Sequence, residues 1–344
     1  MASRHAFLAS ELPLIQAPMA GAQRAALAIA VCNAGGIGSL PCALLSTEAT
    51  RSELTALRAG TDRPFNVNFF CHPQPQVDAE RDARWRQALA PYFREFGIDP
   101  DGVAAGAGRL PFAAAAADLL DEFRPAIVSF HFGLPGEALL ARARRCGARI
   151  IASATTVAEA LWLERHGVDA VIAQGLEAGG HRGHFLSHDL TLQSGTFALL
   201  PQVVAAVRVP VIAAGGIADA AGVAAALGLG ASAVQIGTAY LRCPEATVSA
   251  LHRAALASEA SRHTVLTNLF SGRPARGMVN RVIDELGAIS TAPPEFPLAA
   301  AALAPLRAAA EAAGRSDFTP LWCGQNASGC RDVPAAELTR GFFA

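Results

Sequence analysis

Residues 168–183 read VDAVIAQGLEAGGHRG, an apolar run followed by a glycine-rich loop that presents a histidine. The apolar run is typical of a strand that is covered on both faces. Glycines after a strand let the backbone approach a ligand closely, because they carry no Cβ. His181 supplies the side chain best suited to proton transfer near neutral pH. The segment therefore predicts a cofactor beside a base, although a lone histidine also has a purely structural interpretation.

Eight apolar runs of this kind alternate with segments of helical period. The expected strands are Leu12–Pro18, Gly36–Leu40, Phe65–Phe70, Ala126–Phe132, Arg149–Ser153, Ala170–Ala173, Val209–Ala214 and Ala233–Ile236. The expected helices are Ala22–Asn33, Thr47–Leu57, Ala113–Glu122, Pro135–Cys146, Thr156–His166, Gly195–Val207 and Ala218–Leu229. Eight strand–helix units predict an α/β fold, a (β/α)8 TIM barrel. A doubly wound open sheet is the alternative, but no GxGxxG fingerprint follows the first strand.

Two segments exceed a minimal barrel. Residues 71–110 form a long connection between the third and fourth strands, with a charged helix expected around Glu80–Glu95. The chain beyond Arg242 has mostly helical period. We therefore expect a ligand-binding barrel over residues 1–242, with an insertion at about 71–110. A helical C-terminal extension over residues 243–344 would pack on the barrel as a lid.

The composition excludes several classes of partner. The 344 residues carry a net charge of −1, so no basic field is available to attract nucleic acid. We find no signal peptide and no apolar run long enough to span a bilayer. The seven cysteines are scattered and form no CxxC motif. We expect a cytoplasmic protein without nucleic-acid or membrane partners, acting as a monomer or homodimer on a small molecule.

Lysine is absent from the sequence, and all 28 basic residues are arginines. This absence excludes every mechanism that depends on a lysine amine. A Schiff-base aldolase, a pyridoxal-phosphate enzyme and a Walker-type phosphate site are ruled out.

Two glycine-bearing turns follow the seventh and eighth expected strands, at Gly215-Gly216 and at Gly237. Residues after the strands of a barrel meet at its carboxyl-terminal face, and these two positions commonly hold a phosphate. A plain tight turn is the other interpretation. Apolar and amide side chains are expected at the same face: Met19, Phe69, Phe70, Phe130, Phe132, Asn68 and Gln174. An apolar mouth with a few amides suits a flat heteroaromatic ring, which favours a flavin over a sugar phosphate.

Other histidines have weaker claims to chemistry than His181. His131 follows the fourth strand between aromatic residues, so we expect it, with Phe132, to line the substrate pocket. His184 and His188 could share a helical face and bind a metal, but no carboxylate pair or cysteine lies near them. We therefore predict no metal site.

Several motifs together resemble the nitronate monooxygenases, formerly called 2-nitropropane dioxygenases. The barrel motifs are residues 14–21 (LIQAPMAG), 65–68 (FNVN), 174–183 (QGLEAGGHRG), 213–217 (AAGGI) and 235–238 (QIGT). Residues 129–135 (SFHFGLP), 268–280 and 322–325 (WCGQ) are similar to the bacterial class I branch. The resemblance covers nearly the whole barrel.

The resemblance implies a barrel that binds FMN without a covalent bond and oxidises alkyl nitronates, such as propionate 3-nitronate, with O2. Some members also act on nitroalkanes. It implies His181 as the catalytic base. The implied flavin-binding residues are Met19, Asn68, Gln174, Gly179, Gly216, Gln235, Ile236, Gly237 and Thr238, and Gly215 belongs to the same phosphate turn.

Two alternatives stay open. The fold and the GGH loop are also similar to FMN-dependent enoyl-acyl-carrier-protein reductases and to NADH:quinone reductases, which would use NAD(P)H. Arg182 and the SFHFG loop favour nitronate oxidation over these. A barrel that binds phosphate or flavin without catalysis would leave His181 unexplained.

Overall fold

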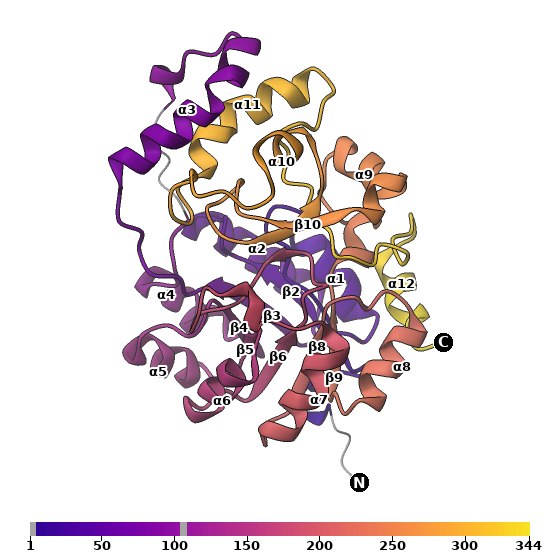
Figure 1. Ribbon diagram of the computed structural model, residues 1–344. Coiled ribbons are helices and arrows are strands. Elements are labelled where there is room, and N and C mark those ends of the chain that lie inside the picture. Colours follow the sequence, from indigo (N-terminus) through magenta and orange to yellow (C-terminus); the bar gives the residue numbers. More distant parts are fainter. Residues whose placement is uncertain (1–4, 104–108) are drawn as a thin grey trace.

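The computed structural model describes residues 5–103 and 109–344. Eight parallel strands form a nearly closed barrel with helices around it (Figure 1). The strands are β1 (Leu14–Gln16), β2 (Gly38–Pro41), β3 (Phe65–Phe70), β4 (Ile127–His131), β5 (Arg149–Ala154), β6 (Ala170–Gln174), β8 (Val211–Ala214) and β9 (Ala233–Ile236). A parallel bridge between Ile15 and Ile37 joins β1 to β2 at the seam. The predicted TIM barrel is confirmed, and each strand lies within two residues of its expected bounds.

The surrounding helices are α1 (Ala25–Asn33), α2 (Thr47–Gly60), α4 (Ala114–Phe123), α5 (Glu137–Arg145), α6 (Val157–Arg165), α7 (Thr196–Ala206) and α8 (Ala220–Gly228). Three of them begin at a side chain that accepts a backbone N–H, namely Ser46, Thr156 and Asp219. Such caps satisfy donors that the first turn leaves unpaired. No helix among the described residues is both long and apolar enough to cross a membrane.

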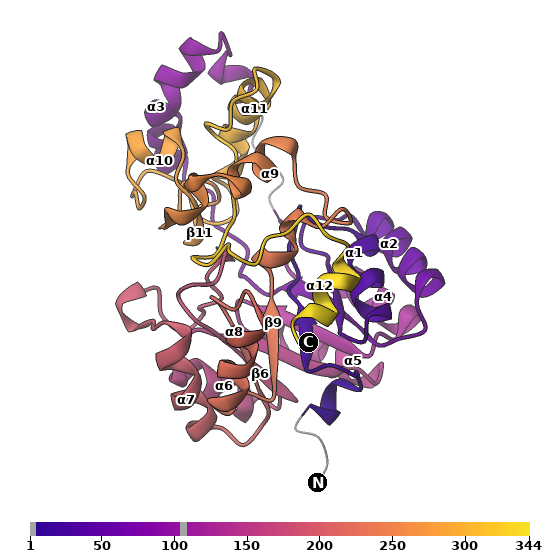
Figure 2. The same cartoon turned by 90° about the vertical axis from the view of Figure 1, so that its right-hand side faces the viewer.

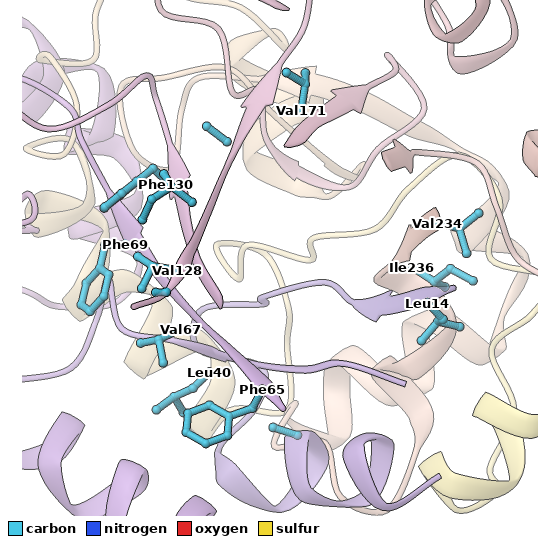
Figure 3. Close-up of a cluster of buried hydrophobic side chains, with 14 of the residues drawn as sticks. Leu14, Leu40, Phe65, Val67, Phe69, Val128, Phe130, Val171, Val234 and Ile236 are labelled. Atoms are coloured by element: carbon cyan, nitrogen blue, oxygen red, sulfur yellow. The ribbon is translucent and has the colours of Figure 1, made fainter. Parts of the chain in front are cut away.

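Alternation along the strands divides the apolar side chains into two layers. One set points outward and packs beneath the helices; Figure 3 shows members from β1, β3, β4 and β9. The other set fills the lower barrel interior and includes Ile127, Ile151, Ile172 and Ile212. Because successive residues of a strand face opposite sides, the side chains above this isoleucine layer point into the upper barrel.

A second apolar cluster lies above the barrel. It joins α3 (Ala79–Glu95), from the connection after β3, to α10 (Arg281–Leu286) and α11 (Ala300–Ala312). The indole nitrogen of Trp85 donates to the carbonyl of Ala299 at 3.1 Å. Helices α3 and α11 lie side by side in both views (Figures 1 and 2). Two segments more than 200 residues apart in the sequence thus share one core.

A three-stranded antiparallel sheet lies between this cluster and the barrel. It consists of β10 (Thr264–Thr267), β11 (Ala275–Met278) and the two-residue β7 (Gly180–His181). The sequence analysis did not predict these strands. Helix α9 (Ala250–Ala257) precedes the sheet, and α12 (Ala335–Gly341) returns to pack on α1 (Figure 2). Short 3-10 helices span Ala6–Leu8, Pro100–Gly102, Leu190–Leu192, Thr238–Arg242 and Glu259–Arg262.

Candidate functional site

The side chain of His181 lies where the barrel meets the small sheet. Its backbone pairs with Ala275 of β11, and its Nε2 lies 2.8 Å from the hydroxyl of Ser271. Four aromatic rings surround the imidazole at centroid distances of 5.2–6.2 Å: Phe70, Phe132, Phe296 and Trp322. The imidazole therefore makes one hydrogen bond to the described part of the chain, inside an aromatic enclosure.

The backbone of His181 is held from the barrel side. Its carbonyl oxygen accepts from Nε2 of His131 and from Nε2 of Gln174, each at 3.1 Å. Nδ1 of His131 lies 3.0 Å from the hydroxyl of Ser153, and Oε1 of Gln174 accepts from the N–H of Gly183 at 2.8 Å. Because a carbonyl can only accept, Nε2 of His131 carries the hydrogen. Both ring nitrogens of His131 thus form hydrogen bonds within the protein, and His131 positions the backbone of His181.

Electrostatics keep these histidines neutral. Burial lowers the pKa of His181 well below its ordinary value, and the positive charge of Arg109 lowers it further. Burial likewise lowers the pKa of His131 to about 3. Desolvation disfavours the charged form of a base, and neighbouring cations act in the same direction. At neutral pH both imidazoles are therefore uncharged, and His181 has a lone pair available.

Two glycines of the loop permit close approaches that a side chain would prevent. A Cβ on Gly179 would lie 2.6 Å from the backbone nitrogen of Gly324. A Cβ on Gly183 would lie 2.8 Å from Cε1 of His131. The intervening Gly180 has φ of +72°, in the left-handed region that glycine adopts without strain. The GGHRG pattern therefore fits the histidine against both the barrel and the C-terminal segment.

Arg182 has a structural role that the sequence analysis did not foresee. Its side chain is fully buried, and its guanidinium donates to the carbonyls of Gln174 and Gly175 and to the side chain of Gln193. A buried cation is tolerated when its donors are satisfied. Arg182 thus ties the end of β6 to the loop that carries His181.

Strand alternation decides which predicted residues reach the upper barrel. Asn68, Gln174 and Gln235 alternate with outward-facing neighbours and lie on the inner face. Ile236 belongs to the outer layer, so only its backbone is available to a ligand in the barrel. The Asn68 amide donates to the hydroxyl and the carbonyl of Ser129 at 2.9 and 3.2 Å.

The expected aromatic mouth needs correction at two positions. Phe69 and Phe130 pack in the outer layer beneath the helices, so their assignment to the mouth was wrong. Phe70 and Phe132 lie beside His181, with Phe296 in the same cluster. Phe132 has φ of +70°, an unfavourable value for a bulky residue that is often found at functional sites.

The turns predicted to hold a phosphate lie together, and the C-terminal segment joins them. The hydroxyl of Thr238 accepts from the N–H of Gly324 at 2.9 Å, and the amide of Asn326 donates to the carbonyl of Gly216 at 3.0 Å. Gly215 and Gly216 both have positive φ. A Cβ on Gly237 would lie 3.7 Å from the sulfur of Met19, so those two residues are also neighbours.

Two buried amide oxygens on the inner face lack a partner among the described residues, Oδ1 of Asn66 and Oε1 of Gln235. Oε1 of Gln235 is shielded from water and accepts no hydrogen bond from the described residues. Such an orphan acceptor is costly unless a ligand donates to it. Gln235 follows the isoleucine layer and directly precedes the Gly237 turn. An orphan acceptor two residues before Gly237, at the same level of the sheet as Gln174, fits a ring-bearing, phosphorylated cofactor.

The residues that sequence reasoning missed come from distant segments. Ser271, Phe296 and Trp322 reach His181 from the C-terminal region, and Arg109 reaches it from the connection before α4. Ser271 and Trp322 lie within the motifs 268–280 and 322–325 that resemble the class I branch. The only sequence signal for Phe296 and Arg109 was that their segments exceed a minimal barrel. The metal alternative gains no support, since the described residues contain no cluster of metal-ligating side chains, and His184 and His188 lie in a loop.

Comparisons with known proteins agree with this geometry. The family model described as nitronate monooxygenase matches residues 3–342. A nitronate monooxygenase of Paraburkholderia phytofirmans is 46% identical, covering 96% of this chain and 91% of the relative. Another, from Pseudomonas aeruginosa, is 44% identical, covering 97% and 95%.

Solved structures give the same grouping. A nitroalkane oxidase from Streptomyces ansochromogenes superposes with a TM-score of 0.89 at 39% identity, covering 99% of this chain and 97% of that one. FabK from Thermotoga maritima superposes with a TM-score of 0.72 at 28% identity, covering 100% and 95%. A single family model over almost the entire chain, with relatives above 40% identity, places this oxidoreductase in the nitronate monooxygenase family.

Proposed function

We propose that this enzyme oxidises alkyl nitronates, such as propionate 3-nitronate, with O2 and non-covalently bound FMN, and also accepts neutral nitroalkanes. The observation that carries the proposal is the neutral imidazole of His181, held by Ser271 inside the aromatic enclosure. A neutral imidazole can accept the acidic proton beside a nitro group. Membership of a flavoenzyme family supports the flavin.

Ser271 determines which ring nitrogen of His181 acts. Its hydroxyl lies 2.8 Å from Nε2 of His181 and 3.3 Å from the carbonyl of Arg273. We assign its one hydrogen to that carbonyl, in which case the hydroxyl accepts from Nε2–H. The lone pair then resides on Nδ1, which takes the proton from the substrate carbon.

The remaining residues orient the reactants and the cofactor. Gln174 and His131 fix the backbone of His181, and the aromatic rings exclude water from the imidazole. Gln235 and Asn68 lie on the inner face where the flavin ring would bind. Gly215, Gly216, Gly237 and Thr238 would hold its phosphate, with Met19 and Gly179 beside them. When bound, FMN supplies the electron acceptor that links the nitronate to O2.

Oxygen uptake with propionate 3-nitronate, with and without NADH, tests the proposal. We expect uptake without NADH. His181→Asn should abolish most activity with neutral nitroethane but retain part of the activity with preformed ethyl nitronate, which needs no base. Equal loss on both substrates would contradict the base assignment.

The likeness to FabK supports a second candidate function, that of an FMN enzyme that oxidises NAD(P)H. Anaerobic mixing with NADH separates the two. Rapid bleaching of the flavin, with no oxygen uptake on nitronates, would replace the first function by the second.

A further inference from the structure

Two arginines near His181, the buried Arg273 and the half-buried Arg109, have no acidic partner among the described residues. The guanidinium of Arg273 lies 4.0 Å above the ring of Phe132, and that of Arg109 lies 5.4 Å from the ring centre of Phe296. Both rings belong to the enclosure of His181. Within residues 5–103 and 109–344, neither arginine forms an ion pair, whereas sixteen arginine–carboxylate contacts occur elsewhere.

Nearby acids do not neutralise these two cations. Glu159 acts on Arg273 from a distance. Its carboxylate is already bound by the N–H and hydroxyl of Thr155 and by the N–H of Phe185. Among the described residues no carboxylate forms an ion pair with Arg109, and burial lowers the pKa of its guanidinium to about 10. The region around His181 therefore carries excess positive charge.

The two arginines differ in how firmly they are held. Arg273 donates through Nη2 to the carbonyl of His184, and its backbone contacts Ser271 on both sides. Arg109 has no comparable hydrogen bond among the described residues, and its Nη1 is buried and unpartnered, as is the Nε of Arg273. A buried guanidinium donor without an acceptor is costly, and a carboxylate or another oxyanion satisfies it with a charge-assisted bond.

His72 adds a second unsatisfied group at the same place. Its Nε2 donates to the backbone carbonyl of Arg109 at 2.9 Å, while its Nδ1 is buried and unpartnered in the described part of the chain. Its ring lies 4.8 Å from that of Phe296. The Arg109 backbone is thus fixed by His72 while its guanidinium keeps a free donor beside Phe296.

We propose that Arg109 is a specificity-determining residue that binds an oxyanion of the substrate next to His181. The inference rests on the proposed function and deepens it. The oxyanion could come from two sources with the same chemistry, a remote carboxylate or the nitronate group itself. Arg109 also disfavours an imidazolium at His181 but stabilises a nitronate, so its charge favours an anionic substrate.

The test compares Arg109→Gln, Arg109→Lys and a control, Arg94→Gln, in the flavin-loaded enzyme. Arg94 is exposed on α3, so the control removes the same charge away from the site. Arg109→Gln should raise KM for propionate 3-nitronate about 10- to 100-fold with little change in kcat, the effect of one charge-assisted bond. Arg109→Lys should recover most of the loss, and Arg94→Gln should behave as the wild type.

Ethyl nitronate, which has no carboxylate, distinguishes the two sources. An unchanged KM for ethyl nitronate identifies the remote carboxylate as the bound group, and an equal rise identifies the nitronate. Unchanged KM values for both substrates overturn the proposal, as does an equal rise in Arg94→Gln.

The binding of succinate, an unreactive dicarboxylate, can be measured by calorimetry without any turnover. We expect its Kd to rise about 10-fold or more in Arg109→Gln. If the wild type oxidises neither nitronate, the proposed function is wrong. The Kd for succinate then still tests whether Arg109 forms an anion site. An unchanged succinate Kd in that case refutes the anion site. Should Arg109→Gln not fold, the KM values and succinate Kd of Arg109→Met take its place.

Discussion

The burial of His184 should make the free energy of unfolding depend on pH, and substitution of His184 should remove that contribution. Its side chain is 1% exposed, and both ring nitrogens lack a hydrogen-bond partner in the described residues. Burial, with positive charge on Arg273, lowers its pKa to about 3. The unfolded chain has the ordinary value of about 6.5. Between about pH 3 and about pH 6.5, His184 binds a proton in the unfolded state but not in the folded state.

The sign and size follow from linkage. A histidine with a depressed folded pKa contributes its full stability above the unfolded pKa, and stability falls as pH drops below about 6.5. At pH 5 the difference is 1.5 pH units, and each unit is worth about 1.36 kcal/mol. His184 alone should therefore make the protein about 2 kcal/mol less stable at pH 5 than at pH 8.

Urea unfolding of the wild type and of His184→Leu at pH 8 and pH 5 measures this contribution. The loss of stability between the two pH values should be about 2 kcal/mol smaller in His184→Leu. The control is His263→Gln, which removes an imidazole exposed to water and is measured at the same two pH values. An identical pH dependence in wild type and His184→Leu would refute the reasoning.

Two further substitutions test the loop and the base. Gly179→Ala places a Cβ 2.6 Å from the backbone of Gly324 and should destabilise the enzyme by about 2–4 kcal/mol, with loss of flavin on gel filtration. Gly228 lies at the end of α8 with open space around it, so Gly228→Ala should leave the thermal stability unchanged or raise it. Equal losses of thermal stability in the two variants would contradict the clash at Gly179. Ser271→Ala frees the ring of His181 and should lower kcat/KM for nitroethane about 10-fold while affecting ethyl nitronate less. Equal effects on both substrates, measured by oxygen uptake, would show that Ser271 does not orient the base.

The barrel could be predicted because its signal is local. Each strand is a short apolar run covered on both faces, and Phe65–Phe70 and Ala233–Ile236 have the bounds that the sequence predicts. The small sheet has no such signal. Strand β7 is only Gly180–His181, and it forms because β11 pairs with it from almost a hundred residues away. Tertiary context therefore creates the strand that carries the histidine.

The residues of the candidate site also divide into those that a local pattern predicts and those that only the tertiary fold brings together. Residue type and spacing are enough to propose a base in the GGHRG loop and a phosphate site at the glycine turns. The period-2 rule, applied to β3 and β4, would have excluded Phe69 and Phe130 from the mouth, since Asn68 and His131 face inward. The arrival of Ser271 and Phe296 at His181 depends on how the C-terminal region folds back, which no local pattern encodes.

The charge around His181 has opposite consequences for the two substrate classes. A neutral nitroalkane must give its proton to an imidazole whose protonated form Arg109 and Arg273 disfavour. A preformed nitronate arrives as an anion, needs no base and gains from the same positive charge. The arginines therefore weaken the base and strengthen binding of the anion at once. Under the proposed function, this charge predicts a preference for nitronates over nitroalkanes, with His181 needed only for the nitroalkanes.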